Sequence, residues 1–324
     1  MECLYTEQRM KQVKLILLCF FSIIICGCNI HDKSLSNVSI EYTVTDEVGR
    51  VIYFNEKPDR IVSLTYGTDE ILIELVGLNR IASFSKWAGN EEITFVTKEQ
   101  TEIVGKKVEE NIEDIVSIKP DLVIASTSTS QDLIDMMNAI GLKVYVASSP
   151  HSYDGMKKKI IGIAEAVGEK EKGNKVIYSM DNRLAKIKNK LDAIDENHKK
   201  TVIAFNFTGA MGRQNDLFDN MLNIANIRNG AAIGGLLNKG QTLSKEQIIK
   251  VNPDIFLLPT WNFDNKHDAE VYYSQFLNDP AYRNLNAIKN KQIKFVSDKY
   301  RYTASHHIVD AIEVLAYSIY PEVF

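Results

Sequence analysis

The sequence predicts an α/β protein in which two similar lobes are joined by one long helix. Short apolar segments typical of buried strands alternate with helical segments, as in parallel sheets that helices cover on both faces. This alternation occurs twice, once before and once after residues 169–197. The stretch between the two copies has the periodicity of a single amphipathic helix. We therefore expect the order lobe, helix, lobe along the chain.

The predicted connecting helix occupies residues 169–197. Its apolar side chains follow one another at intervals of three and four residues, which places them on one helical face. They are Ile177, Met180, Leu184, Ile187, Leu191 and Ile194. A continuous helix of this extent would be about 43 Å long, comparable to a whole small domain.

The N-terminal lobe is predicted over residues 39–168 and begins with a hairpin within residues 40–54. Apolar and polar residues alternate on both sides of a turn at Asp46 to Arg50, which is the pattern of a hairpin. We expect strands at 60–64, 80–84, 121–125 and 143–147, and helices at 69–76, 111–118, 131–140 and 153–167. Thr68 is the candidate N-cap of the first helix, and Gly77 ends it.

The C-terminal lobe is predicted over residues 198–324 and repeats the pattern. We expect strands at 201–207, 254–258 and 293–296, and helices at 216–225, 244–251 and 308–320. The segment from Glu113 to Ile124 aligns without gaps on the segment from Glu246 to Leu257. Both contain a glutamate, an apolar pair, a Pro-Asp dipeptide and a strand in the same register. This repeat is the reason to expect two lobes of one kind.

The N-terminus has the features of an export signal. Lys11 and Lys14 precede an apolar run from Leu15 to Ile25, and Ile25-Cys26-Gly27-Cys28 follows the form of the bacterial lipobox. Eleven apolar residues are too few to span about 30 Å of hydrocarbon, so a transmembrane anchor is not predicted. Residues 1–28 are therefore interpreted as a lipoprotein signal peptide with lipobox, and 29–38 as a flexible tether. We expect lipidation of Cys28 and attachment to the extracytoplasmic face of the cell membrane.

The signal peptide would begin more typically at Met10, in which case residues 1–9 are not translated.

Composition excludes several classes of function. The net charge of −4 does not favour nucleic acid as a partner. All four cysteines lie within the first 28 residues, so the folded part cannot contain a disulfide framework or a thiolate metal site. The chain contains no Gly-x-Ser-x-Gly elbow, no P-loop and no His-Glu-x-x-His motif, and we predict that it is not an enzyme.

A series of short motifs carries a family resemblance. They are Pro58-x-Arg60-Ile-Val-Ser-Leu64, Thr68-Asp69-Glu70-Ile71-Leu72, Val104-Gly105 with Asn111-Ile112-Glu113, Lys119-Pro120-Asp121, Asn252-Pro253-Asp254, Leu285-x-Ala287-Ile288-Lys289-Asn290 and Tyr320-Pro321-Glu322. Together and in this order they resemble bacterial solute-binding proteins of the ABC importers for iron–siderophores, haem and cobalamin. The resemblance covers about residues 40–324.

The resemblance implies a type III periplasmic-binding fold, with two Rossmann-like lobes of mostly parallel sheet joined by one long helix. It implies a ligand held in the cleft between the lobes, and only modest closure because the helix resists hinge motion. The implied partners are an ABC permease dimer with its ATPase and a small-molecule metal chelate. The chain itself would be a monomer without a resident cofactor.

Glu113 and Glu246 match two glutamates that, in this family, project from the two lobes and pair with arginines of the permease. One carboxylate on each lobe would let the permease sense the distance between the lobes. A plainer interpretation is that each carboxylate only stabilises the N-terminus of its helix.

Candidate ligand contacts lie in loops at the carboxyl ends of the predicted strands, where open α/β sheets bind ligands. They are Tyr66, Lys86, Trp87 and Lys106 in the N-terminal lobe, and Arg213, Trp261, Arg301 and Tyr302 in the C-terminal lobe. Aromatic rings beside cations suit a large anionic metal chelate. A ferric siderophore is preferred, followed by cobalamin and then haem.

Other ligands and roles are considered on the same residues. A haem would need an axial ligand, for which the candidates are Tyr66, Met211, Tyr300, Tyr302, His306 and His307. A bare zinc or manganese ion is not predicted, because the N-terminal lobe has no histidine between His31 and His151. A surface lipoprotein without a transport role remains an alternative, although it would not need paired glutamates.

Overall fold

The computed structural model describes residues 41–261 and 268–324, so the predicted signal peptide, Cys28 and the tether lie outside the described residues. An antiparallel hairpin of β1 (Tyr42–Thr45) and β2 (Val51–Phe54) opens the described part, as predicted. The Asp46 carboxylate accepts hydrogen bonds from the backbone N–H groups of Val48 and Arg50 and so closes the turn.

Two sheets follow, one from each half of the chain. The first has the order β5-β4-β3-β6-β7 and is parallel throughout. The second has the parallel order β10-β8-β11-β12, with β9 added antiparallel to β8. The predicted α/β class with mostly parallel sheets is confirmed. We use "N-terminal lobe" and "C-terminal lobe" for the sheets with the helices that cover them.

The strands are short. Those of the N-terminal lobe are β3 (Ile61–Ser63), β4 (Ile81–Ser85), β5 (Lys107–Val108), β6 (Leu122–Ser126) and β7 (Val144–Ala147). Those of the C-terminal lobe are β8 (Thr201–Asn206), β9 (Gly209–Met211), β10 (Arg228–Asn229), β11 (Ile255–Leu258) and β12 (Ile293–Phe295).

Helices connect the strands. In the N-terminal lobe they are α2 (Tyr66–Val76), η1 (Leu78–Arg80), α3 (Lys98–Val104), α4 (Ile112–Ile118), α5 (Gln131–Ala139) and α6 (Tyr153–Ala166). Helix α7 (Lys170–Leu191) and η2 (Glu196–His198) lead to the C-terminal lobe. That lobe contains α8 (Leu217–Ile224), α9 (Gly230–Ile233), α10 (Lys245–Val251), α11 (Ala269–Leu277), α12 (Asn286–Lys289), α13 (Asp298–Arg301), α14 (Ile308–Ile319) and η3 (Pro321–Val323). In the described part of the chain, every helix is too short or too polar to cross a membrane.

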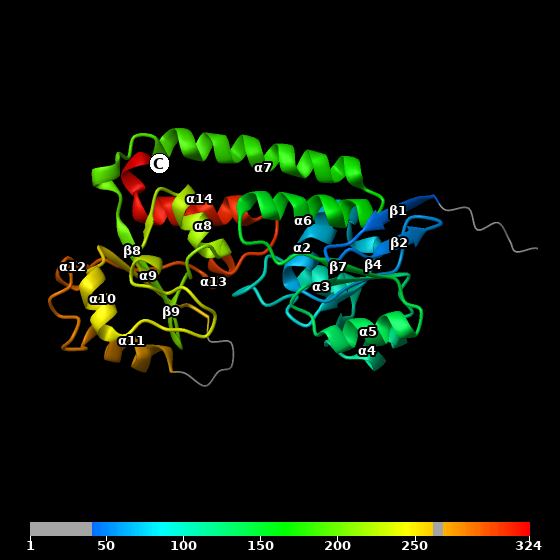
Figure 1. Ribbon diagram of the computed structural model, residues 1–324, viewed down its shortest axis with the longest axis horizontal. Helices are drawn as coiled ribbons and strands as arrows, with labels where there is room; N and C mark the ends of the chain where they lie inside the picture. Colours follow the sequence, from blue (N-terminus) through cyan, green and yellow to red (C-terminus); the bar gives the residue numbers. More distant parts are fainter. Residues whose placement is uncertain (1–40, 262–267) are drawn as a thin grey trace, which may run out of the picture. The chain divides into compact units, whose positions relative to one another are not determined.

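The strands bury both faces, as expected for parallel sheets. On β6, Leu122 and Ile124 face a core that contains α6 and α7, whereas Val123 and Ala125 face a separate core with α4 and α5. The C-terminal sheet alternates in the same way, so that β8 and β11 each contribute to two cores. Figure 1 shows α6 on one side of the N-terminal sheet and α4 and α5 on the other.

Helix α7 packs against α6 and α14, and Figure 1 shows it running alongside both. The predicted apolar stripe is the buried one, from Met180 to Leu191. The prediction of one helix over residues 169–197 is wrong beyond Leu191, where the chain turns. The Asp195 carboxylate accepts hydrogen bonds from the N–H groups of Asn197 and His198, which favours a short 3₁₀ turn over continued helix. The 22 residues of α7 make it about 33 Å long.

Other boundaries also differ from the predictions. Helix α2 begins at Tyr66 because Thr65, not Thr68, is its N-cap, and Thr68 completes a capping box with it. Arg301, predicted in a loop, is the last residue of α13, and β9 precedes Arg213 where no strand was predicted. Helices α3, α9, α11, α12 and α13 were not predicted, because several have only four to nine residues and little periodicity.

The Pro-Asp repeat has a structural explanation. Asp121 accepts hydrogen bonds from the N–H groups of Asp59 and Arg60, and Asp254 accepts one from Thr201, so each aspartate fixes the start of a neighbouring strand. Lys119 and Asn252, just before the prolines, end α4 and α10 in the left-handed conformation. The two copies therefore perform the same function in the two sheets.

Candidate functional site

Two adjoining cavities of about 360 Å³ each lie at the carboxyl ends of the strands. The first is lined mainly by the N-terminal lobe, including Thr65, Tyr66 and Trp87, and the second mainly by the C-terminal lobe, including Met211 and Arg213. They share five lining residues, Ser149, Pro150, Leu217, Tyr302 and Thr303. We call the two together the cleft, because both lobes line it.

The two tryptophans meet across the lobes. The rings of Trp87 and Trp261 pack edge to face with their centroids 5.7 Å apart. This geometry is favourable for aromatic pairs and joins the loop after β4 to the loop after β11. Trp87 also lines the first cavity. A ligand in the first cavity therefore meets the ring of Trp87, against which Trp261 packs, and we call this pair the aromatic wall.

A buried aspartate holds the loop of each tryptophan in place. The Asp69 carboxylate accepts hydrogen bonds from the N–H and hydroxyl of Ser85, at 3.1 and 2.6 Å, just before Trp87. Asp298 accepts hydrogen bonds from the N–H groups of Thr260 and Trp261, both at 2.7 Å. Desolvation raises the pKa of Asp69 to about 7, although the bonds from Ser63 and Ser85 oppose that rise. Neither aspartate was predicted as part of the site.

Arg301, a predicted ligand contact, is buried and bonds mainly to groups of the protein itself. It is 1% exposed, and its guanidinium pairs with Asp298 at 3.1 Å and donates to the carbonyl oxygens of Leu258 and Phe205. It faces inward because α13, which was not predicted, turns it toward the sheet. Although it lines the second cavity, most of its donors are directed to the protein. Its evident role is to compensate the buried charge of Asp298.

The remaining predicted cations are distributed unevenly. Lys86 forms an ion pair with Glu109 at 3.0 Å and lies 5.4 Å from the centroid of the Trp87 ring. Arg213 lines the second cavity and is 4.0 Å from its ion-pair partner Asp216. Lys106 is exposed and lines neither cavity of the cleft. The structure therefore brings Arg213 to the cleft and Lys86 to its aromatic wall, but not Lys106.

Tyr66 and Tyr302 lie at the junction of the lobes. The Tyr66 hydroxyl donates to the carbonyl oxygen of Tyr302 at 2.7 Å, and both residues line the first cavity. Burial raises the pKa of both phenols, so both are protonated at neutral pH. Each therefore offers the cleft a polar ring and not a phenolate.

Lys159 and Thr303 line the cleft but were not predicted. The Lys159 ammonium is 5% exposed and donates to the carbonyl oxygen of Ala304 at 2.8 Å. A signal for it was present, because Lys159 lies on the same helical face as the buried Met156 and Ile163. Thr303 offered no such signal, since it follows the unpredicted α13.

The candidate metal ligands are scattered within the described ranges. No group of three or more His, Cys, Asp and Glu side chains is arranged there to hold a metal ion. Among the candidate axial ligands for haem, Tyr66, Met211 and Tyr302 line the cleft. Tyr300 and His307 line a separate hollow, and His307 is paired with Asp310 at 2.6 Å. His306 is half-buried, and desolvation lowers its pKa to about 3.

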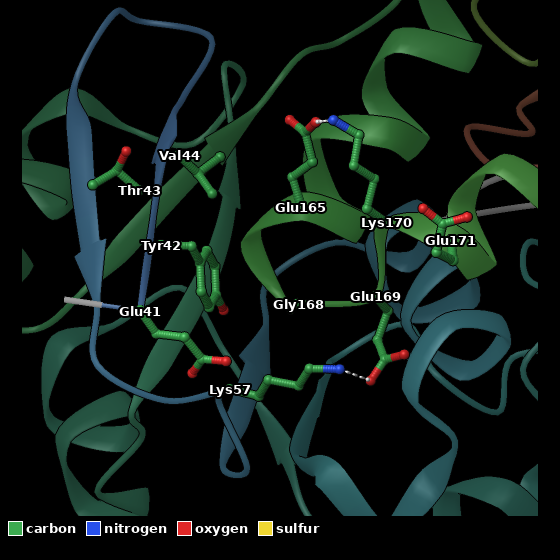
Figure 2. A pocket seen from close by; sticks show the side chains of 10 residues that line it. All are labelled: Glu41, Tyr42, Thr43, Val44, Lys57, Glu165, Gly168, Glu169, Lys170 and Glu171. Carbon is green, nitrogen blue, oxygen red and sulfur yellow. Dashed lines mark hydrogen bonds and ion pairs between the residues drawn. The ribbon is translucent and has the colours of Figure 1, made fainter. Parts of the chain in front are cut away.

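A further hollow of about 520 Å³ lies at the opposite, amino edge of the N-terminal sheet, beside β1 and the turn between α6 and α7. Figure 2 shows two ion pairs among its charged side chains. Lys57 contacts Glu169 at 3.3 Å and Lys170 contacts Glu165 at 2.7 Å. Tyr42 donates its hydroxyl to the carbonyl oxygen of Ala166. Because these contacts join β1 and the segment before β3 to α6 and the start of α7, we assign the hollow a structural role.

Comparison with known proteins agrees with this geometry. The model of the family described as "Periplasmic binding protein" matches residues 61–300. The chain belongs to the periplasmic binding protein family. It is 26% identical over 310 residues to the "Probable siderophore-binding lipoprotein YfiY" of Bacillus subtilis (strain 168). The match covers 90% of this chain and 93% of that protein.

Solved structures of periplasmic binding proteins share the fold. The haem-binding protein RhuT from Roseiflexus sp. RS-1, in its apo form, has a TM-score of 0.69 at 21% identity and covers 82% of this chain and 99% of its own. The molybdate-binding protein MolA of Haemophilus influenzae has a TM-score of 0.70 at 18% identity, and the match covers 88% of this chain and 93% of the MolA chain. These neighbours confirm the predicted fold class.

In this periplasmic binding protein, Glu113 and Glu246 occupy equivalent positions. Each is the second residue of its helix, α4 or α10, after an Asn111 or Ser244 N-cap, and each side chain is exposed. The Glu246 carboxylate accepts hydrogen bonds from its own backbone N–H and from the Ser244 side chain. These bonds lower its pKa, so the carboxylate is charged at neutral pH. The structure thus presents one exposed carboxylate on each lobe.

We predict a pH dependence of stability from Lys159. Desolvation lowers its pKa from 10.5 to about 8, and Glu70 opposes this only in part. Between these two values the unfolded chain binds more protons than the folded one, so rising pH favours the folded state. The free energy of unfolding should gain up to about 1.4 kcal/mol per pH unit from this residue. Lys159→Met should lose this gain in urea unfolding measured from pH 7 to 10.

The exposed Lys57→Met variant is the matched control and should keep the pH slope of the wild type. Equal slopes for the wild type and Lys159→Met would show that the pKa of Lys159 is not lowered.

Proposed function

We propose that this protein is an extracytoplasmic solute-binding lipoprotein that captures an iron(III)–siderophore-type chelate in the cleft and delivers it to an ABC permease. The observation that carries the proposal is the aromatic pair of Trp87 and Trp261, contributed by both lobes, with Lys86 beside Trp87 and Arg213 in the adjoining cavity. Aromatic faces and cations together suit a large anionic chelate. The name of its relative YfiY supports the same ligand class.

Cobalamin or haem bound by the same mechanism is the alternative. The tryptophan pair would equally form the wall of a site for a corrin or porphyrin. For haem, Tyr66, Met211 and Tyr302 are the candidate axial ligands in the cleft. RhuT, which shares the fold, is described as a haem-binding protein.

The proposed role is binding and transfer, not catalysis. Lipidation of Cys28 would attach the protein to the outer face of the cell membrane, and residues 29–38 would give the folded part freedom to reach its permease. The lobe boundaries at 39–168 and 198–324 belong to this proposal. Each sheet draws all its strands from one of these ranges, which supports the division.

Tryptophan fluorescence tests the binding site. Titration of residues 29–324 with a ferric siderophore, cyanocobalamin or haemin should give saturable quenching with one ligand class at sub-micromolar concentration. Trp87→Phe and Trp261→Phe should each lower the quenching amplitude and weaken binding about tenfold, since each removes part of the wall. Saturable binding by calorimetry that both variants leave unchanged would place the ligand elsewhere.

Docking to the permease is proposed for Glu113 and Glu246. The matched position in two helices and the exposure of both side chains support it, because a partner that contacts both lobes can sense their separation. An electrostatic contact of this kind steers association as well as fixing orientation. The pairing residues on the permease would be cationic.

The double variant Glu113→Ala/Glu246→Ala should reduce uptake of the radiolabelled chelate by cells at least tenfold while chelate binding by the purified protein stays unchanged. Glu99→Ala is the matched control, because Glu99 is also an exposed second residue of a capped helix, α3. Normal uptake by the double variant would refute docking. Equal loss in the control would indicate helix stabilisation instead.

A further inference from the structure

Hydrogen-bond donors of three kinds line one wall of the first cavity, beside the N-terminus of α2. They are the Lys159 ammonium, the Thr303 hydroxyl and the first backbone N–H groups of α2, at Tyr66 and Gly67. They come from three separate elements, and no motif in the sequence joins them. Their common property is that each can donate to a negatively charged oxygen.

Lys159 is a buried cation with spare donors. Of the three N–H bonds of an ammonium group, the structure accounts for one, which goes to the carbonyl oxygen of Ala304 at 2.8 Å. The nearby carboxylate of Glu70 is already occupied, because it accepts bonds from Thr94, Phe95 and Ser305. An anion in the cavity would therefore meet a cation that its own protein does not fully compensate.

The Thr303 hydroxyl is 98% buried yet lacks a hydrogen-bond partner among the described residues. An unpartnered buried hydroxyl is unfavourable, and native proteins seldom retain one without a reason. Its side chain lines both cavities of the cleft. A ligand oxygen in the cleft would supply the missing partner.

Helix α2 adds its own positive end. Its N-cap Thr65 accepts from the N–H of Thr68, whereas the N–H groups of Tyr66 and Gly67 precede any intrahelical acceptor. The helix has eleven residues, long enough for its aligned peptide dipoles to favour an anion at this end.

The segment 302–305, which we call the strap, holds Thr303 against this helix end. The Tyr66 hydroxyl donates to Tyr302, Lys159 donates to Ala304, and Ser305 donates to Glu70. Gly67 permits the close approach, because a Cβ there would lie 2.5 Å from the carbonyl oxygen of Ala304. The strap is therefore fixed to the N-terminal lobe at three points.

We propose that Lys159, Thr303 and the N-terminus of α2 form an anion subsite that binds a free carboxylate of the chelate. A carboxylate has two oxygens and can accept from all three kinds of donor at once. Glu110 also lines this cavity; desolvation raises the pKa of its carboxyl, and the positive charge of Lys86 opposes that rise. The inference rests on the proposed function and adds that the preferred chelate is anionic through a carboxylate that the iron leaves free.

Calorimetric titration with two iron chelates tests the subsite. Ferric citrate carries free carboxylate, whereas ferrichrome is neutral. Lys159→Met and Thr303→Val should each weaken binding of ferric citrate at least tenfold and change binding of ferrichrome less than twofold. Thr303→Ser, which keeps the hydroxyl, should restore wild-type affinity for ferric citrate. Lys57→Met, which removes a lysine far from the cleft, should change neither affinity.

Thermal unfolding of each variant shows whether it is folded. If Lys159→Met does not fold, Thr303→Val alone still tests the subsite. Unchanged binding of ferric citrate, or equal losses for both chelates, would overturn the subsite and leave the proposed function standing. If the wild type bound neither chelate, both would be excluded as its ligand, and the proposed function would depend on the fluorescence titration. The subsite would then be judged with iron-free citrate, whose binding must depend on Lys159 and Thr303.

Discussion

Burial of the apolar faces of α6, α7 and α14 is the constraint on which both lobes depend, because these helices share one core with one face of each sheet. Residues from β6, α7 and β8 belong to this same cluster. A wide opening of the lobes would expose part of it to water, at a cost of about 25 cal/mol for each Å² of apolar surface. The core therefore limits relative motion and keeps the carboxyl ends of the two sheets beside a common cleft.

The polar interactions of the cleft are arranged around this fixed frame. Asp69 and Asp298 are buried where each can bind the loop that carries a tryptophan, and Arg301 compensates the second of them. Burying a carboxylate is costly unless it accepts several hydrogen bonds, and both do. The loops that carry the aromatic wall are thus held by buried charged groups. This explains why Arg301, a cation in the right segment, is a supporting residue.

Most of the fold could be predicted from the sequence, and much less of the site. Periodicity and the Pro-Asp repeat indicated the parallel sheets and the apolar stripe of α7, because these depend on many residues acting together. The end of α7 depended on one carboxylate, Asp195, and was missed. Helix α13, which carries Arg301, was missed because it has only four residues. Thr303 gave no signal, since Tyr66 and Lys159, which bind its neighbours Tyr302 and Ala304, come from distant parts of the chain.

The central claim, that a chelate lies in the cleft between the tryptophan pair and the strap, is tested most directly by crystallography. Crystals of residues 29–324 grown with ferric citrate would be measured at the iron absorption edge. The account predicts one anomalous peak within the cleft, bordered by Trp87, Trp261 and Thr303. An iron peak in the hollow between β1 and α7, or on an outer face of either lobe, with the cleft empty, would contradict it.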